Sequence, residues 1–235
     1  MCWIGRRMKK ISFNKKKHEY TINDKKLEGV TSFISKLFLP FEREKIAGYC
    51  STSTKSAQDF MDEWDEATNS GSRVHKALEN HVLGLPTNLK SEVDALKVAQ
   101  GLKAFHEIFS VLSEPICETE VIVGSEELGL AGTIDLLITH NKDSSRVVTL
   151  VDWKTNKVIS KSGFGKTGVV PATCHLADCG FVKYGLQLSF YAYILETEYG
   201  CVINNLLLVH LKEGSYEIIE IPYMRGDVVK ILEEL

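Results

Sequence analysis

The chain has 235 residues, 44% of them hydrophobic, and carries a formal net charge of −3 at pH 7. This length supports one large globular domain, or one domain with a small accessory lobe. No stretch approaches the roughly 18–20 consecutive apolar residues of a membrane-spanning helix, and no apolar run follows the first arginines as in a secretory signal. We therefore expect an intracellular protein without a membrane partner, and import into an organelle stays open.

The six cysteines are scattered in a way that predicts reduced thiols rather than a disulfide framework. Cys174 and Cys179 bracket His175, but no further zinc ligands stand at suitable spacing, so we interpret this cluster as incidental. Residues 1–17 hold seven lysines and arginines and no acidic residue. This basic segment is either a solvated tail or a local surface for nucleic acid.

The first part of the chain predicts a hairpin and two short helices. Residues 9–22 have the pattern of a hairpin, and a turn follows at 23–26. Residues 30–39 predict a short helix with Thr31 or Ser32 as its N-cap, and a second helical piece follows at 41–49.

Two longer helical patterns come next. Apolar residues recur with helical spacing from 59 to 81, but the Asn-Ser-Gly sequence at 69–71 interrupts them. We therefore predict two helices here, with Ser70 or Ser72 capping the second. Residues 92–112 predict one amphipathic helix.

The period then changes to that of strands. Three strands joined by short polar turns predict an antiparallel meander, and a long loop, a helix ending at Gly200, two strands and a final helix follow. The predicted fold is therefore mixed α/β, with a central mixed sheet flanked by helices. The expected ranges are 117–123, 130–140 and 147–155 for the meander, 157–184 for the loop, 184–200 for the helix, and 202–211, 215–223 and 227–235 for the last elements.

Three charged residues stand out on the otherwise apolar strands of the meander. Asp152 and Lys154 share one strand face, while Asp135 lies on the preceding strand at the open end of the same hairpin. Two buried carboxylates close together are costly unless a cation compensates them, and hard carboxylate oxygens suit Mg²⁺ or Mn²⁺. A lysine beside them is suited to polarising a water and neutralising developing charge. The alternative is a salt bridge at a strand end with no chemistry.

Four short motifs in order resemble one family. Gly132-Thr-Ile-Asp135, 17 residues before Asp152-Trp-Lys154-Thr155, resembles the signature of PD-(D/E)XK nucleases. The RecB-like branch of that family is the more specific match. Its G-x-x-x-H-x-x-x-E helix resembles 71–79, and its Q-x-x-x-Y helix resembles 187–191. The residues of the GTID and VDWKT motifs are similar to those of the group of mitochondrial genome maintenance exonucleases and related phage and viral exonucleases. The resemblance spans roughly residues 29–211.

The resemblance implies a restriction-endonuclease-like core at 59–235, with residues 1–58 accessory to it. It implies that Asp135 and Asp152 hold Mg²⁺ or Mn²⁺ and that Lys154 orients or activates the attacking water. Additional ligands would be His75 and the Trp153 carbonyl. Supporting residues would be Glu79, Gln187 and Tyr191, with Glu120 as the preferred acid of the first meander strand.

The implied activity is a metal-dependent nuclease, specifically a DNA exonuclease acting on single-stranded ends in replication, recombination or repair. RNA is a further possible substrate, and a helicase, recombinase or single-strand-binding protein is a possible partner. Nearby lysines that we expect to contact phosphates are Lys157, Lys161, Lys166 and Lys183. The alternatives are a non-catalytic nucleic-acid-binding module, a structure-specific endonuclease, and an enzyme acting on a small phosphorylated substrate.

Two cofactors are not expected. The cysteine trio that accompanies an iron–sulfur cluster in some RecB-like nucleases is missing after Cys201. Residues 163–168 (GFGKTG) resemble a phosphate-binding loop, but Ser160 replaces the first glycine that the full motif needs, so we predict no ATP site.

Overall fold

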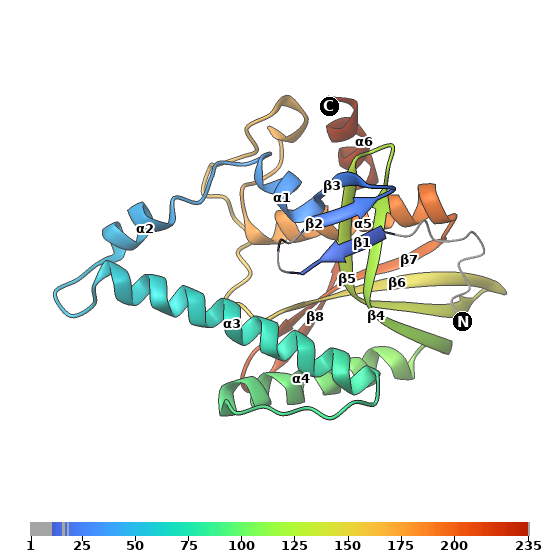
Figure 1. Cartoon of the computed structure of the whole chain (residues 1–235), viewed down its shortest axis with the longest axis horizontal. Helices are drawn as coiled ribbons and strands as arrows, with labels where there is room; N and C mark the ends of the chain where they lie inside the picture. The colour runs from blue at the N-terminus through green and yellow to red at the C-terminus, as the bar shows by residue number, and fades with distance from the viewer. Residues whose placement is uncertain (1–10, 16, 18, 235) are drawn as a thin grey trace.

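A mixed sheet carries helices on both of its faces in the computed structural model, which describes residues 11–15, 17 and 19–234 (Figure 1). Eight described strands form the sheet, in the order β1-β2-β3-β5-β6-β7-β8, with β4 paired to β5. The pairs β3–β5 and β6–β7 are parallel and the others are antiparallel. This arrangement confirms the predicted α/β class.

The strands are β1 (Ile11–Asn14), β2 (Glu19–Ile22), β3 (Lys25–Gly29), β4 (Ser113–Ser125), β5 (Leu130–Lys142), β6 (Ser145–Lys154), β7 (Ile203–Leu211) and β8 (Tyr216–Ile221). The helices are α1 (Val30–Ser35), α2 (Arg43–Cys50), α3 (Ala57–Val82), α4 (Glu92–Ser110), α5 (Gly180–Tyr199) and α6 (Arg225–Glu233), with a 3₁₀ turn η1 at Pro171–Thr173. Among the described residues, no helix is both long and apolar enough to cross a membrane.

The predicted meander is the centre of the sheet. Strands β4, β5 and β6 follow one another as antiparallel neighbours, and β5 faces β6 in the register Leu136↔Val151. Asp143 and Ser144 form a two-residue turn between them and both have positive φ, as in a type I′ hairpin. The register places Asp135 and Asp152 at the other end of this hairpin, as the sequence predicts.

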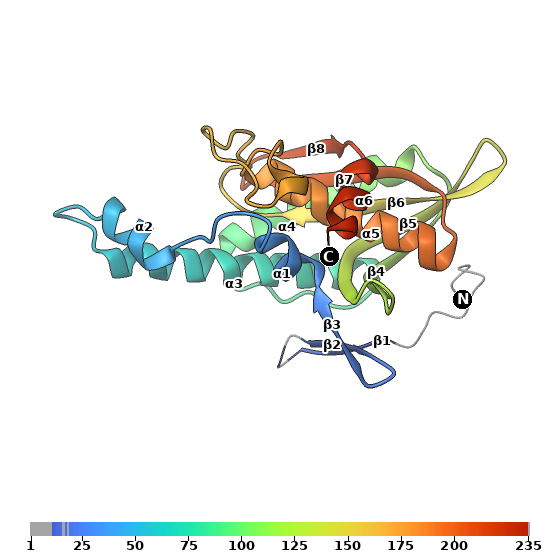
Figure 2. The ribbon, with the colours of Figure 1, turned by 90° about the horizontal axis from the view of Figure 1, so that it is seen from above.

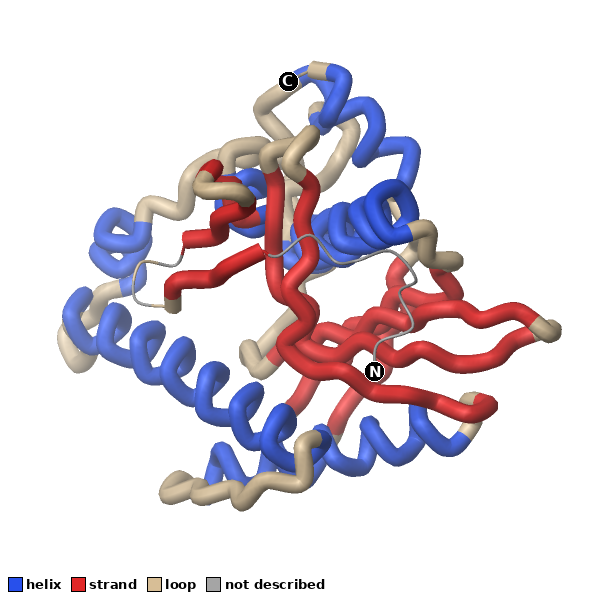
Figure 3. The backbone as a smooth tube through the Cα atoms, turned by 45° about the vertical axis from the view of Figure 1, so that its right-hand side comes forward, coloured by secondary structure: helices blue, strands red, loops and turns tan. Residues whose placement is uncertain are grey.

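The two faces of the sheet bury separate apolar clusters. Helices α1, α5 and α6 cover one face, where Phe33 and Phe190 pack edge to face. Helices α3 and α4 cover the other face, where Val74 and Val98 pack against Trp153. The separation of the two helical layers by the strands is visible in Figure 3, and Figure 2 shows the β1–β2 hairpin lying apart from both. Because β6 contributes to both clusters, it lies in the middle of the core.

The predicted break in the long helix at 69–71 is wrong, because α3 is continuous from Ala57 to Val82. Ser56 caps its N-terminus in a capping box with Asp59, so neither Ser70 nor Ser72 is a cap. The buried Ser70 hydroxyl donates a hydrogen bond to Asp94 on α4 instead. The small polar residues therefore serve helix packing rather than helix termination.

Other element ends differ from the prediction in smaller ways. Helix α1 begins at Val30 after Gly29, which offers no side-chain cap, so Thr31 and Ser32 lie inside the helix. Strand β4 begins at Ser113, and α5 begins at Gly180, within the predicted loop. Gly200 ends α5 with a left-handed conformation, as predicted. The division of the chain at residue 58 stays a prediction.

Candidate active site

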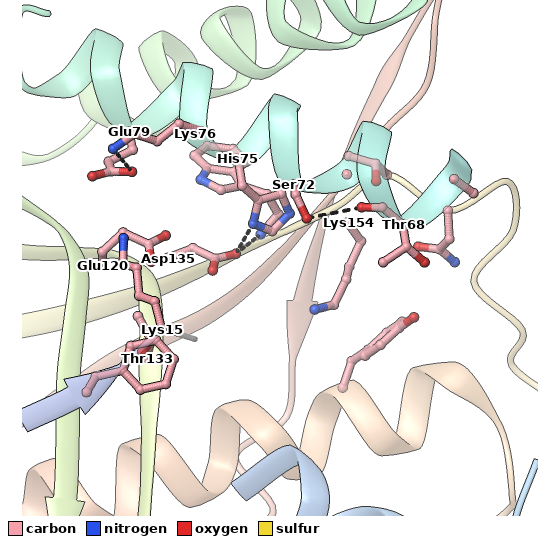
Figure 4. A pocket seen from close by; sticks show the side chains of 17 residues that line it. Lys15, Thr68, Ser72, His75, Lys76, Glu79, Glu120, Thr133, Asp135 and Lys154 are labelled. Atoms are coloured by element: carbon pink, nitrogen blue, oxygen red, sulfur yellow. Dashed lines mark hydrogen bonds and ion pairs between the residues drawn. The ribbon is translucent and has the colours of Figure 1, made fainter. Parts of the chain in front are cut away.

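A cleft of about 830 Å³ lies between helix α3 and the strands β4, β5 and β6. Figure 4 shows that His75 reaches down from α3, Asp135 and Lys154 come from the strands, and Glu120 faces the same space from β4. The sequence predicts these four residues as parts of one site. They come from four separate elements, α3, β4, β5 and β6, and the fold brings them together.

Asp135 is held in place from two sides. Its Oδ2 accepts a hydrogen bond from the Trp153 backbone N–H at 2.9 Å and lies 3.4 Å from Nδ1 of His75. Burial by itself would raise the pKa of Asp135, but the facing His75 and Lys154 hold it below its ordinary value. Burial would likewise lower the pKa of His75, and Asp135 outweighs it and raises that pKa. Each group of the pair therefore favours the charged form of the other in the wall of the cleft.

Asp152 is more deeply buried than Asp135, at 4% exposed. Its Oδ1 accepts a hydrogen bond from Nε2 of Gln187 on α5 at 3.0 Å. Its Oδ2 lies 2.6 Å from Nζ of Lys154, yet accepts no hydrogen bond of regular geometry. Burial raises the pKa of Asp152, and the nearby Asp135 raises it further against the effect of Lys154. The Lys154 ammonium is therefore the cation that compensates this buried oxygen in the structure.

Lys154 pairs with Asp152, and both aspartates favour its charged form. Burial by itself would lower its pKa, but Asp152 and Asp135 outweigh burial and raise the pKa of Lys154. Its Nζ also lies 4.5 Å from the centre of the Tyr184 ring, a cation–π contact that supports the ammonium from α5. The salt bridge expected from the D-x-K spacing is thus present, inside a cleft rather than at an exposed strand end.

Trp153 points to the opposite face of the sheet from its two charged neighbours. Its ring is 4% exposed and packs in the cluster beneath α3 and α4. The strand alternation that the sequence predicts for Asp152, Trp153 and Lys154 is therefore observed. Because the ring is fixed in the core, the backbone N–H that binds Asp135 is fixed too.

Close approach of neighbouring side chains explains two glycines of the motifs. A Cβ on Gly132 would come within 2.3 Å of Cε1 of Tyr191, and a Cβ on Gly71 would come within 2.9 Å of Oγ1 of Thr155. Tyr191 is buried and does not line the cleft, so it acts here by packing against β5. Burial raises its pKa strongly, so the phenol stays neutral.

Two glutamates add negative charge to the cleft. Glu79 pairs with Lys76 at 2.7 Å, one turn away on α3. Glu120 lies opposite Asp135, between the register pairs Thr119↔Leu136 and Val121↔Ile134, and its φ is +51°. This conformation is rare for glutamate and is often found at functional sites. Burial, and then Asp135 and Glu79, raise the pKa of Glu120.

The four lysines expected to contact phosphates do not line the cleft. Lys157, Lys161 and Lys166 are exposed on the segment that follows β6, and Lys183 forms an ion pair with Asp178 at 2.6 Å. Lysines that do line the cleft are Lys15, Lys76 and Lys154. The first two were not singled out from the sequence, because nothing in the local pattern separates them from other surface lysines.

Two further residues near the site are also missing from the sequence prediction. Lys97 on α4 donates a hydrogen bond to the Thr155 carbonyl at 3.3 Å, and His210 on β7 lies 2.6 Å from the Asn156 carbonyl through its Nε2. His210 faces Lys154 in the parallel β6–β7 register. Together they fix the chain just beyond Lys154. The packing of α4 reveals the role of Lys97, and the pairing of β6 with β7 reveals that of His210.

As placed, the described residues contain no group of three or more His, Cys, Asp or Glu side chains that could hold a metal ion. Protein cations and donors occupy the two aspartates instead: His75 and the Trp153 N–H on Asp135, and Lys154 and Gln187 on Asp152. The donor set nevertheless fits Mg²⁺ or Mn²⁺, because it offers hard carboxylate oxygens and one buried oxygen without a regular hydrogen bond. His175, from the predicted incidental cysteine cluster, pairs with Asp227 at 2.8 Å.

Comparison with known proteins gives no family. No protein-family model matches the sequence, and no curated protein matches it significantly. The solved structure "Crystal structure of SSO0001" shares 16% sequence identity and a TM-score of 0.28, over 71% of this chain and 84% of that one. A likeness of this size carries no argument about function, so the function is argued from the cleft itself.

Proposed function

We propose that this protein is a metal-dependent nuclease that hydrolyses phosphodiester bonds, specifically a DNA exonuclease acting on single-stranded ends. One observation carries the proposal: Asp135, Lys154 and His75 line one cleft from two adjacent strands and a helix, and the buried Asp152 pairs with Lys154 behind that lining. The order of the four motifs along the chain adds the family resemblance to PD-(D/E)XK nucleases of the RecB-like branch. The proposed setting is intracellular, in replication, recombination or repair.

The residues that would hold Mg²⁺ or Mn²⁺ are Asp135 and Asp152, with His75 and the Trp153 carbonyl as further ligands. When bound, the ion supplies Lewis acidity that activates water and stabilises negative charge on the phosphate. Glu79 and Glu120 face the same space and add to its attraction for cations. No iron–sulfur cluster and no ATP enter the proposed reaction.

The protein's own groups account for positioning and charge. Lys154 is an ammonium, so its role is to orient the attacking water and to neutralise charge that develops on the phosphate. Gln187 orients Asp152, and the Trp153 N–H orients Asp135. Tyr191 keeps β5 and α5 in contact at Gly132 and thus supports both aspartates.

The experiment compares cleavage of an end-labelled DNA oligonucleotide in Mg²⁺ and in Mn²⁺ by the wild type, Lys154→Ala and Asp152→Asn. We expect both variants to lose at least about 100-fold in rate. Matched controls are Lys142→Ala and Asp143→Asn at the far end of the same hairpin, where both residues are exposed. Equal cutting by wild type and site variants, or no cutting in either metal, refutes the nuclease assignment.

Measuring binding of the oligonucleotide beside its cleavage separates the alternatives. Binding without cleavage indicates the non-catalytic module, and cleavage of internal sites in branched or gapped duplexes indicates the structure-specific endonuclease. An RNA oligonucleotide run in parallel tests the sugar preference. A helicase, recombinase or single-strand-binding protein remains a proposed partner, since the chain has no ATP-binding motif of its own.

A further inference from the structure

An exposed phenylalanine stands at the tip of a tight turn in the segment between β6 and α5. Phe164 is 90% exposed, the highest fraction among the large hydrophobic residues described. The segment is drawn in gold and extends outward from the body near α1 in Figures 1 and 2. Packing in the core therefore does not account for the position of this ring.

The turn itself is well ordered by hydrogen bonds. Lys166 N–H donates to the Gly163 carbonyl at 2.9 Å, and the two central residues, Phe164 and Gly165, have φ of +49° and +83°. This is the pattern of a type I′ turn. The Phe164 N–H also donates to the Ser162 hydroxyl at 3.1 Å.

The base of the turn is held in the same way by the later part of the same segment. The Lys166 carbonyl accepts a hydrogen bond from the Asp178 N–H at 2.9 Å, and Thr167 bridges Ala177. Gly168 N–H donates to the Leu176 carbonyl at 3.0 Å. The backbone of the tip is therefore held in place, while the Phe164 side chain that it carries is almost fully exposed.

Phe164 occupies a position that favours other residues. A left-handed conformation at the first central position of such a turn suits Gly, Asn or Asp, which bear it at lower cost than phenylalanine. Exposure of the ring to water adds a second unfavourable contribution. Both contributions argue for a ligand that contacts the ring, since neither the turn nor the core accounts for it.

The charge of the segment identifies the chemistry of that ligand. From Trp153 to Ala177 the sequence has four lysines and no acidic residue, in a chain whose net charge is −3. Lys161 and Lys166 stand on either side of the tip and are exposed. The segment begins directly at Lys154 in the cleft. A polyanion with flat aromatic groups could extend from the cleft along this segment. Its negative charges would pair with the lysines, and one of its aromatic groups would stack on the Phe164 ring.

We propose that Phe164 stacks on a base of single-stranded nucleic acid bound in the cleft, with Lys161 and Lys166 on the flanking phosphates. This inference rests on the nucleic-acid substrate of the proposed function and adds a contact away from the metal ligands. Stacking of a base on an aromatic side chain is independent of sequence. It would hold the strand in register with the cleft without reading its bases.

The test measures equilibrium binding of a labelled single-stranded DNA oligonucleotide with Ca²⁺ in place of Mg²⁺. We expect Phe164→Ala to weaken binding about 5-fold to 150-fold and Phe164→Trp to restore it. Leu85→Ala, at a residue 52% exposed beyond α3, is the control and should bind as the wild type does. Lys166→Gln should lower the slope of log affinity against log salt by about 0.7.

An abasic oligonucleotide of the same length separates stacking from a structural effect. It should bind wild type and Phe164→Ala equally, because it offers no base to stack. Equal binding of the normal oligonucleotide by wild type and Phe164→Ala overturns the inference, and cleavage by the wild type then leaves the nuclease proposal intact. Binding that depends on Phe164 without any cleavage supports the inference and counts against the nuclease.

A lipid surface is the competing ligand. Binding to vesicles of phosphatidylserine and phosphatidylcholine that depends on Phe164, with no binding of the oligonucleotide, overturns the inference in favour of a membrane contact. Failure of the wild type to bind either ligand also overturns it.

Discussion

Replacing Gly71 by alanine tests whether α3 must approach the end of β6 closely. In a helix interior this change normally stabilises a protein by about 0.8–1 kcal/mol. Here the added Cβ would come within 2.9 Å of Thr155 Oγ1, next to Lys154. Overpacking of this kind costs about 1–3 kcal/mol, so the net change in unfolding free energy is a loss of up to about 2 kcal/mol.

Gly48 on α2 provides a matched control, because no atom lies within 4 Å of a Cβ built there. Gly48→Ala should therefore show only the increase in unfolding free energy that alanine brings to a helix. For a chain of this length about 1 kcal/mol corresponds to about 2–4 °C in Tm. Gly48→Ala should raise Tm by about that amount, and Gly71→Ala should lower Tm or leave it unchanged. Thermal unfolding followed by circular dichroism measures both.

The displacement should also affect cleavage. A shift of Thr155 moves the neighbouring Lys154, and small misplacements of a catalytic group can reduce kcat about 100-fold. The double variant Gly71→Ala/Thr155→Ala removes the colliding hydroxyl and should regain activity toward that of Thr155→Ala. If Gly71→Ala instead stabilises the protein as Gly48→Ala does, with normal kcat, the close approach has no functional role.

Three further outcomes follow from other contacts. Burial alone would raise the pKa of Asp94, but the hydrogen bond from Arg73 holds it below its ordinary value of 3.8. The ionised Asp94 carboxylate therefore stabilises the folded protein above about pH 3.8, and this stabilisation is lost as the pH falls through the lowered pKa. Asp94→Asn should cost about 1–2 kcal/mol in urea unfolding at pH 7 and progressively less at acid pH. Burial raises the pKa of Cys117 to about 11, so at pH 8 it should react with a disulfide reagent far more slowly than the exposed Cys174. His210→Gln should lower kcat with little change in KM, because His210 holds the chain beyond Lys154 and does not hold the substrate. A lower Tm with unchanged kcat would contradict this prediction.

The strands of the meander are well predicted from the sequence, because alternation and turn residues are local signals, whereas the sequence predicts a turn over part of β3 at Lys25–Gly29. The pattern of VVTLVDWKT places Asp152 and Lys154 on one face and Trp153 on the other, as the structure has them. The polar sequence at 141–146 predicts the turn between the strands, and the structure narrows this turn to Asp143 and Ser144. From these signals alone, Asp135 is expected beside Asp152.

The errors arise where tertiary contacts override local preference. Asn69-Ser70-Gly71 has the composition of a helix break, but Ser70 bonds the buried Asp94 and Gly71 makes room for Thr155. Neither partner is near in sequence, so no local pattern reveals the contact. The same holds for Lys97 and His210, which act on the exit of β6 through the helix layer and the parallel strand beside it.

These contacts converge on the short segment that ends β6. Trp153 fixes it to the core, Gly71 sets its distance from α3, and Lys97 and His210 hold its carbonyls. A lone salt bridge between Asp152 and Lys154 would need none of this support, since a strand end tolerates shifts that leave the pair intact. The proposed site for a cation and a phosphate requires Lys154 to keep a fixed position relative to both aspartates. The contacts that hold this segment would meet that requirement.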